Sequence, residues 1–310
     1  MAYIFAHFKE KITRDGEQVY FAVSKDGYTF ESLNGGEPVL ESKKGTRGCR
    51  DIELVPLHKG GFVIITTDLC IVDLMDENYN VNWKYVNSHG SKNLTMWKSD
   101  DLIHFEEQKQ IYFGRDDFGC LWAPEVFFDE INQEYIIHFG STNIEDNYTH
   151  MKIYYTKTKD FESFTYPEVF FEKDNEILDS HLVKADGTYH LFYKNSENPS
   201  GNMHAVSKEL FGKYEDDEAF WNIMNSYGSP GSYEGPTTYK LPNGKWCLML
   251  DFFGCEKSKM GYVPFVSNSV GDCSFKMDKE SFTFPYGFKH GCVKEISDEL
   301  YIKLKKHYNK

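Results

Sequence analysis

A unit of three strands recurs along the 310-residue chain and constrains its fold more than any other feature of the sequence. Each unit opens with a polar residue that leads into an apolar run, a strongly apolar second strand follows, and a third strand with a Ser/Thr-x-Asp-like turn comes after it. The spacing between successive opening residues is 74, 54, 55 and 56 residues. Such a period is typical of one four-stranded propeller blade, so the sequence predicts five blades. The opening residues are Asp51, Glu125, Asp179, Glu234 and His290.

The fifth unit is incomplete, because little chain follows His290. The N-terminus carries three further apolar runs, at residues 3–8, 19–26 and 29–33, which would complete it. We therefore expect an all-β fold, a five-bladed β-propeller whose fifth blade is closed by both N- and C-terminal strands. Residues 1–310 would form a single catalytic domain. A β-sandwich or two small β domains is the alternative, but neither explains why the end of the chain begins a unit that its start completes.

Two segments lie outside the repeat. The excess length of the first spacing falls at residues 71–90, an Asp- and Asn-rich stretch that includes Trp83, and we expect it to form an inserted loop over one face. Residues 297–310 predict a short C-terminal helix, because acidic residues come first and lysines later, the order that a helix dipole favours. No other helix is predicted.

Composition limits the partners of the chain. With 34 basic and 48 acidic residues, the formal charge is −14, which argues against nucleic acid because phosphate binding needs a basic surface. No apolar run reaches the roughly 20 residues of a membrane span, and the N-terminal sequence does not resemble a signal peptide. Seven cysteines without a C-x-x-C pair predict neither a disulfide framework nor a zinc site. We expect a cytoplasmic protein.

Convergence of the five opening residues at one end of the propeller would gather four carboxyl groups and an imidazole. Carboxylates held close together raise one another's pKa, so that one can donate a proton while another accepts one. Glycoside hydrolysis needs this combination of a general acid and a general base. The alternative for any single Asp or Glu at a strand start is a solvated turn residue, but this does not explain their register with the repeat.

Five short motifs resemble those of glycoside hydrolase family 43, whose members are five-bladed propellers. Three of them depart slightly from the family pattern, because Ile52 and Ser180 stand where proline is common, and Lys289 replaces a common arginine. The motifs are Gly48-Cys-Arg-Asp51-Ile, Leu121-Trp-Ala-Pro-Glu125-Val, Ile177-Leu-Asp179-Ser-His, Tyr233-Glu234-Gly-Pro236 and Lys289-His290-Gly291.

The resemblance implies an inverting mechanism with three catalytic carboxyl groups. Asp51 would be the base that deprotonates a water molecule, and Glu234 the acid that protonates the departing oxygen. Asp179 would orient Glu234 and keep it protonated. His290 would hold a water molecule or a calcium ion on the propeller axis. No cofactor would be required for the reaction itself.

A sugar pocket needs an aromatic face for the ring and a few polar groups for its hydroxyls. Trp122 belongs to one of the motifs and is the first aromatic candidate, with Trp97 as the second. Arg50 lies beside the predicted base, where it could pair with Asp51 or with a neighbouring carboxylate. The full set of predicted substrate-binding residues is Arg50, Asp68, Trp97, Trp122, Glu125, Lys194 and His290.

The substrate expected from the resemblance is a short plant-type oligosaccharide, since a cytoplasmic enzyme would meet no polymer. We expect exo-acting release of terminal L-arabinofuranose, with D-xylose as a second product, from fragments of arabinoxylan or arabinan. The alternatives are a main activity as β-xylosidase or arabinanase, or a non-catalytic propeller that binds sugar. Retention of all three expected carboxyl groups favours an enzyme over a binding module.

Overall fold

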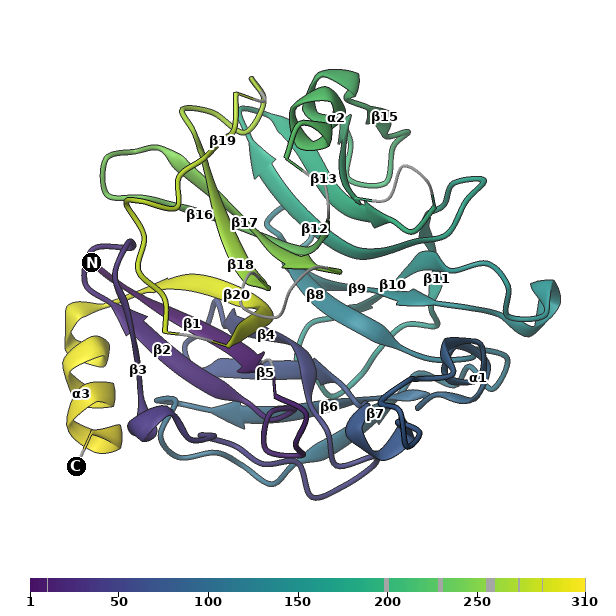
Figure 1. Cartoon of the computed structure of the whole chain (residues 1–310), viewed down its shortest axis with the longest axis horizontal. Coiled ribbons are helices and arrows are strands. Elements are labelled where there is room, and N and C mark those ends of the chain that lie inside the picture. Colours follow the sequence, from purple (N-terminus) through teal and green to yellow (C-terminus); the bar gives the residue numbers. More distant parts are fainter. Residues whose placement is uncertain are drawn as a thin grey trace.

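Five four-stranded antiparallel sheets surround a common centre in the computed structural model of the chain (Figure 1). The structure describes residues 1–9, 11–197, 201–227, 231–254, 260–272, 274–285 and 287–309. Each of the first four blades is a contiguous stretch of chain whose strands pair in sequence order, β4 to β7, β8 to β11, β12 to β15 and β16 to β19. The predicted five-bladed propeller is therefore confirmed.

The innermost strand of each blade begins close to one of the predicted opening residues. These strands are β4 (Arg50–Pro56), β8 (Trp122–Asp129), β12 (Ile177–Ala185), β16 (Ser232–Lys240) and β20 (Phe288–Ile296). Each contacts the innermost strands of both neighbouring blades, so the five form a closed ring. The outer strands are β5 (Phe62–Thr67), β6 (Asn93–Ser99), β7 (Lys109–Tyr112), β9 (Glu134–Ser141), β10 (Lys152–Thr158), β11 (Glu168–Phe171), β13 (Thr188–Asn195), β14 (Gly201–Ser207), β15 (Glu215–Asp216), β17 (Trp246–Phe253), β18 (Gly261–Ser267) and β19 (Lys276–Met277).

The fifth blade joins the two ends of the chain, as predicted. Its strand order is β20, β1 (Ala2–Lys9), β2 (Tyr20–Ser24) and β3 (Phe30–Ser32). β1 pairs antiparallel with β20 from Ala2 opposite Ile296 to His7 opposite Gly291. This ladder of backbone hydrogen bonds closes the ring, because no covalent connection does.

The helices agree only partly with the sequence prediction. The C-terminal helix is confirmed as α3 (Asp298–Tyr308), with the Ser297 hydroxyl accepting the Leu300 N–H as N-cap. Two more helices occur, α1 (Trp83–His89) within the predicted insertion and α2 (Glu218–Asn225) after β15, so the expectation of a single helix was wrong. Short 3-10 turns lie at η1 (Asn34–Gly36), η2 (Val72–Leu74) and η3 (Ile144–Asp146). None of the described helices is long and apolar enough to cross a membrane.

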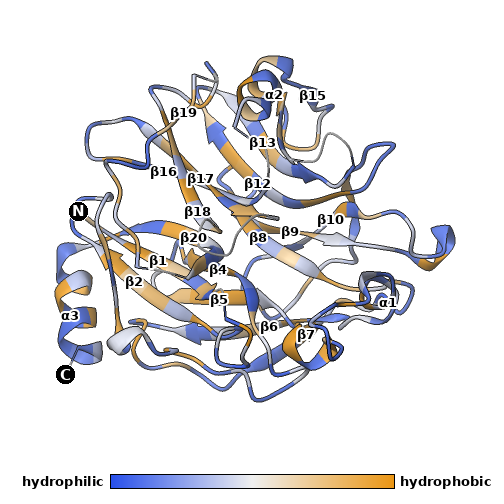
Figure 2. Cartoon of the chain, in the orientation of Figure 1, coloured by the Kyte–Doolittle hydropathy of each residue, from blue (hydrophilic) through white to orange (hydrophobic). Residues whose placement is uncertain are grey.

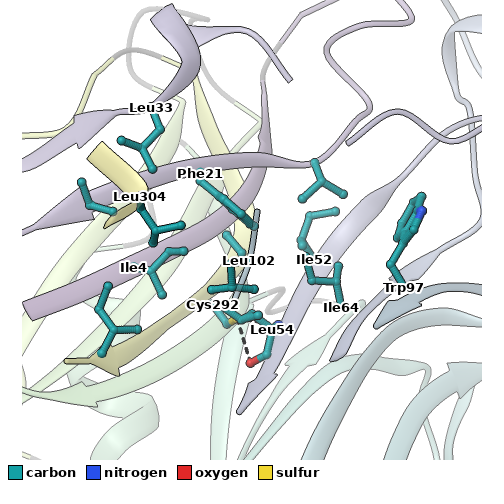
Figure 3. Packing of buried hydrophobic residues seen from close by; sticks show 14 of the residues in the cluster. Ile4, Phe21, Leu33, Ile52, Leu54, Ile64, Trp97, Leu102, Cys292 and Leu304 are labelled. Carbon is teal, nitrogen blue, oxygen red and sulfur yellow. Dashed lines mark hydrogen bonds between the residues drawn. The ribbon is translucent and has the colours of Figure 1, made fainter. Parts of the chain in front are cut away.

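The hydrophobic core consists of layers between neighbouring blades rather than one central mass. One cluster fills each of the five interfaces, while the loops are hydrophilic (Figure 2). Figure 3 shows the layer between the fifth and first blades, where Ile4 and Phe21 face Ile52 and Leu54. Every blade is covered by a neighbouring blade on both sides, which explains why its strands carry apolar residues on both faces.

Ile4 tests the contribution of this closing layer to stability. Its side chain is 0% exposed, and removal of three carbons leaves a cavity between two blades. We expect Ile4→Ala to lower the free energy of unfolding by about 2–5 kcal/mol in urea denaturation. The control Ile131→Ala, at a side chain that is 77% exposed, should change it by less than about 0.5 kcal/mol. Equal effects of the two substitutions would contradict this account of the core.

Candidate active site

A β-bulge near the start of each innermost strand aims the predicted catalytic side chains. In every blade, two residues of the innermost strand stand opposite one residue of its neighbour. Asp51 and Asp179 occupy the first bulge position of their blades with φ angles of 52° and 50°. This left-handed conformation is strained for a residue other than glycine, and such strain is typical of functional sites.

The repeat suggested that the five opening residues occupy equivalent positions, but their positions relative to the bulge differ between blades. In the fourth blade the first bulge position belongs to Gly235 (φ 56°), and Glu234 precedes it. In the second blade it belongs to Ala123 (φ 47°), and Glu125 follows the bulge. A Cβ atom on Gly235 would also lie 2.7 Å from the His290 ring, so this position needs glycine for two reasons.

A cavity of about 440 Å³ opens where these bulges meet. It brings together Asp51, Asp179 and Glu234, which come from three different blades. Its volume lies in the range of small-ligand pockets. The other lining residues are Arg50, Leu69, Ile71, Trp83, Asn87, Trp122, Met151, Glu176, Leu178, Lys194, Ser196 and Phe253.

His290 lies between two of the carboxyl groups. Its Nδ1 atom is 3.2 Å from Asp51 Oδ1 and 3.7 Å from Asp179 Oδ2. Burial alone would lower the pKa of His290, but the negative charges of Asp179 and Asp51 raise it to about 10. An imidazolium here therefore balances part of the charge that the carboxyl groups concentrate at the centre of the propeller.

Asp51 is held as a carboxylate. Burial opposes its ionisation, but hydrogen bonding and charge attraction from His290, together with Arg50, bring the pKa of Asp51 to about 2. The Thr67 hydroxyl donates to Asp51 Oδ2 at 2.7 Å and accepts the Ala123 N–H at 2.7 Å. Thr67 ends the second strand of the first blade, and the sequence prediction missed it.

Glu234 and Asp179 share an environment that separates their pKa values. Lys194 Nζ lies 2.5 Å from Glu234 Oε2, and this ion pair lowers the pKa of Glu234 although burial would raise it. Burial and repulsion from Glu234 and Asp51 raise the pKa of Asp179 to about 7, against the attraction of His290. In the unliganded chain the proton of this coupled pair therefore favours Asp179, whereas the sequence analysis expected it on Glu234.

Arg50 pairs with a residue that the sequence did not suggest. Its Nη1 atom donates to Glu17 Oε1 at 3.0 Å, and its guanidinium group lies 4.4 Å from the centre of the Phe8 ring. Glu17 is buried and also accepts the backbone N–H groups of Ile71 and Val72. One carboxylate thus fixes both the cation beside Asp51 and the start of the insertion.

Four predicted substrate-binding residues do not line the cavity: His290, which contacts Asp51 and Asp179 instead, and Trp97, Asp68 and Glu125. Trp97 is 4% exposed and packs in the core layer between the fifth and first blades, so the prediction for this residue was wrong (Figure 3). Asp68 is buried and accepts hydrogen bonds from Thr46 and Ser91, which makes it a link between two loops. Asp68 follows the end of β5 and Trp97 lies within β6, and in neither case does the sequence show whether the side chain faces the cavity.

Glu125 is buried and does not line the cavity either. Its Oε2 atom is 2.6 Å from His181 Nδ1, and burial raises the pKa of Glu125 to about 8. This contact belongs to the buried interior and not to the cavity lining, so the structure does not support direct sugar binding by Glu125.

The groups around His290 offer few of the ligands that a calcium ion prefers. Calcium prefers several oxygen ligands, whereas an imidazolium is a hydrogen-bond donor. The described residues contain no cluster of three or more His, Cys, Asp or Glu side chains that could hold a metal. The calcium site stays a prediction, and no step below depends on it.

Five cysteines within the described residues are free and buried, namely Cys49, Cys70, Cys120, Cys247 and Cys292. Cys255 and Cys273, to which the expectation of no disulfide framework also applied, lie outside the described residues.

Comparison with known proteins agrees with this fold. Residues 1–301 match a family model described as a probable glycosyl hydrolase domain, related to glycoside hydrolase family 43. The match spans nearly the whole chain, so the chain belongs to this family of glycosyl hydrolase domains.

Individual relatives are distant. An α-L-arabinofuranosidase of Bifidobacterium longum subsp. longum is 24% identical over 268 residues, which cover 75% of this chain and 24% of that protein. The chain thus spans about a quarter of the length of this curated relative.

Solved structures share the propeller fold at low identity. The family 43 protein BlXynB of Bacillus licheniformis is 15% identical with a TM-score of 0.58, over 90% of this chain and 54% of that chain. An α-L-arabinanase of Penicillium chrysogenum, solved with arabinobiose, is 13% identical with a TM-score of 0.51, over 76% and 68%. At these identities the likeness supports the fold alone.

The pairing of His290 with two carboxyl groups predicts a pH dependence of stability. Because the pKa of His290 is about 10 in the folded chain and 6.5 when unpaired, its contribution is complete below pH 6.5 and is lost as the pH rises to about 10. We expect the free energy of unfolding to fall between about pH 6.5 and pH 10, and His290→Gln to remove this part of the slope.

Urea denaturation at several pH values measures the effect. His307→Gln, at an exposed position on α3, serves as the control and should keep the wild-type slope. A slope that is unchanged in His290→Gln would show that the ring is not ion-paired.

Proposed function

We propose that this chain is an exo-acting, inverting glycoside hydrolase that releases terminal L-arabinofuranose from short oligosaccharides, with D-xylose as a second product. The observation that carries the proposal is the convergence of Asp51, Asp179 and Glu234 in one sugar-sized cavity of a chain that belongs to a glycosyl hydrolase family. A site with these groups has both a proton acceptor and a proton donor, which the reaction needs.

Asp51 acts as the general base in this proposal. Its low pKa keeps it ionised at neutral pH, and Thr67 and His290 fix its orientation. It takes a proton from a water molecule, whose oxygen attacks the anomeric carbon while the glycosidic bond breaks.

Glu234 protonates the departing glycosidic oxygen. The Asp179–Glu234 pair holds the proton near neutral pH, because the pKa of Asp179 is about 7. The Gly235 N–H donates to Asp179 Oδ2 at 3.2 Å, which anchors Asp179 directly beside the backbone of Glu234. Lys194 lowers the pKa of Glu234, so delivery of the proton requires this ion pair to loosen when the sugar binds.

The choice of arabinofuranose rests on the relatives. The curated relative from Bifidobacterium longum subsp. longum is named an α-L-arabinofuranosidase, and one of the solved structures is an α-L-arabinanase with arabinobiose. Trp122 supplies an aromatic wall and Arg50 and Lys194 supply hydrogen-bond donors in the cavity. The cytoplasmic location of the protein stays a prediction.

Replacement of the acid and the base tests the function. We expect Glu234→Gln and Asp51→Asn each to lower kcat by about 10²–10⁴-fold, because each removes a proton-transfer group and keeps the size of the side chain. Hydrolysis of nitrophenyl α-L-arabinofuranoside and nitrophenyl β-D-xyloside measures it, with circular dichroism to confirm folding. Sugar binding without hydrolysis by the wild type would instead identify a binding module.

Lys194→Met tests the control of the acid. Loss of the cation raises the pKa of Glu234, because the ion pair is the main influence that lowers it. Since the acid must be protonated to act, the alkaline limb of the kcat/KM profile should move to higher pH. The control is Lys240→Met, a lysine at the outer end of β16. An alkaline limb that stays in place or moves to lower pH in Lys194→Met would contradict the assignment of Glu234 as the acid.

A further inference from the structure

The insertion that lengthens the first blade presents one face of α1 to the cavity. Trp83 and Asn87 both line the cavity and stand four residues apart, which places them on the same side of the helix. Val86, on another side, is buried in a small cluster with Leu69 and Ile71. The orientation of α1 is therefore set by packing.

Contacts from two other blades hold the insertion in place. At its start, Glu17 accepts the backbone N–H groups of Ile71 and Val72. At its end, the Thr142 hydroxyl donates to the Asn87 carbonyl oxygen, and the Leu121 N–H donates to the Ser91 carbonyl oxygen at 3.1 Å. A side chain on α1 is thus positioned before any ligand arrives, which reduces the entropy lost on binding.

Trp83 stands at the rim of the cavity, above the carboxyl groups. It is 48% exposed, whereas the side chains of Asp179 and Glu234 are 8% and 22% exposed. Its ring lies 6.0 Å from that of Trp122 in an edge-to-face arrangement, which leaves part of the indole open. An exposed indole beside a polar cavity is suited to stack against the apolar face of a sugar ring.

Asn87 offers a polar group next to this aromatic face. Its Oδ1 atom is buried and has no hydrogen-bond partner among the described residues. A buried acceptor without a donor is unfavourable, so the amide gains a hydrogen bond if it turns toward a ligand hydroxyl in the cavity. An aromatic ring with a neighbouring amide is a combination that recognises sugars.

We propose that Trp83 and Asn87 form the binding subsite for the first sugar unit of the leaving group. The inference rests on the proposed function, because in an exo-acting enzyme the released sugar lies deep, beside the carboxyl groups, and the remaining chain extends toward the rim. The insertion therefore determines which oligosaccharides are cleaved, while the bulges of the innermost strands carry out the chemistry.

A comparison of two substrates tests the subsite. The leaving group of an arabinofuranosyl xylo-oligosaccharide is a sugar chain, whereas that of methyl α-L-arabinofuranoside is methanol. We expect Trp83→Ala to lower kcat/KM for the oligosaccharide about tenfold more than for the methyl glycoside, which corresponds to about 1.4 kcal/mol. Trp83→Phe should retain most of the wild-type kcat/KM for the oligosaccharide. Asn87→Ala should also lower kcat/KM more for the oligosaccharide than for the methyl glycoside, but by a smaller factor than Trp83→Ala.

Tyr79→Ala is the matched control, because Tyr79 belongs to the same insertion, is 68% exposed and does not line the cavity. It should leave both rates unchanged. Equal losses on the two substrates in Trp83→Ala, or no loss on either, would overturn the subsite.

Binding separates this inference from the proposed function. Xylobiose and arabinobiose, titrated into Glu234→Gln, report leaving-group binding without hydrolysis. If the wild type cleaves no glycoside, the proposed function fails, and the subsite is still decided by whether Trp83→Ala in the same background weakens binding of either disaccharide. Unchanged affinity for both would refute it.

Discussion

The pairing of β1 with β20 is the interaction on which the rest of the structure depends. Each blade is apolar on both faces, so every sheet must be covered on both sides, and only a closed ring covers the last one. Backbone hydrogen bonds between the two ends of the chain provide that closure. The same closure places His290, which arrives last in the chain, against Asp51 and Asp179 from two other blades. The backbone pairing of β1 with β20 therefore both closes the fold and completes the site.

The centre of the ring concentrates like charges, and its cations make that arrangement stable. Asp51, Asp179 and Glu234 would repel one another strongly in a buried site, but His290 bridges two of them and Lys194 pairs with the third. His290 and Lys194 act on the three acids to different extents, so the three carboxyl groups differ in pKa although they share one cavity. Chemically identical groups can therefore take different parts in one reaction.

The sequence predicted the periodic features of the structure and missed the local ones. Spacing fixed the blade count and the closure by both ends, because a repeat of similar length implies equivalent units. The bulges were not visible, since they depend on backbone φ, and this concealed that Glu234 and Glu125 lie on opposite sides of the bulge in their blades. The helix α2 had a readable signal, Asp217 as N-cap and then Phe220 and Met224 four residues apart, that was overlooked. Trp122 was tied to a motif, whereas only the tertiary packing shows that Trp97 lies in the core.

Glu17 connects two parts of the molecule that have separate tasks. Its carboxylate holds Arg50, whose charge helps to keep Asp51 ionised, and it also holds the backbone where the insertion departs from the first blade. The position of the insertion, which forms one wall of the cavity, and the position of Arg50 beside Asp51 therefore depend on the same carboxylate. Changes to the insertion after Val72 can alter the substrate range without disturbing Glu17. A shift of Ile71 or Val72 would instead displace Glu17, and with it the Arg50 side chain that helps to keep Asp51 ionised.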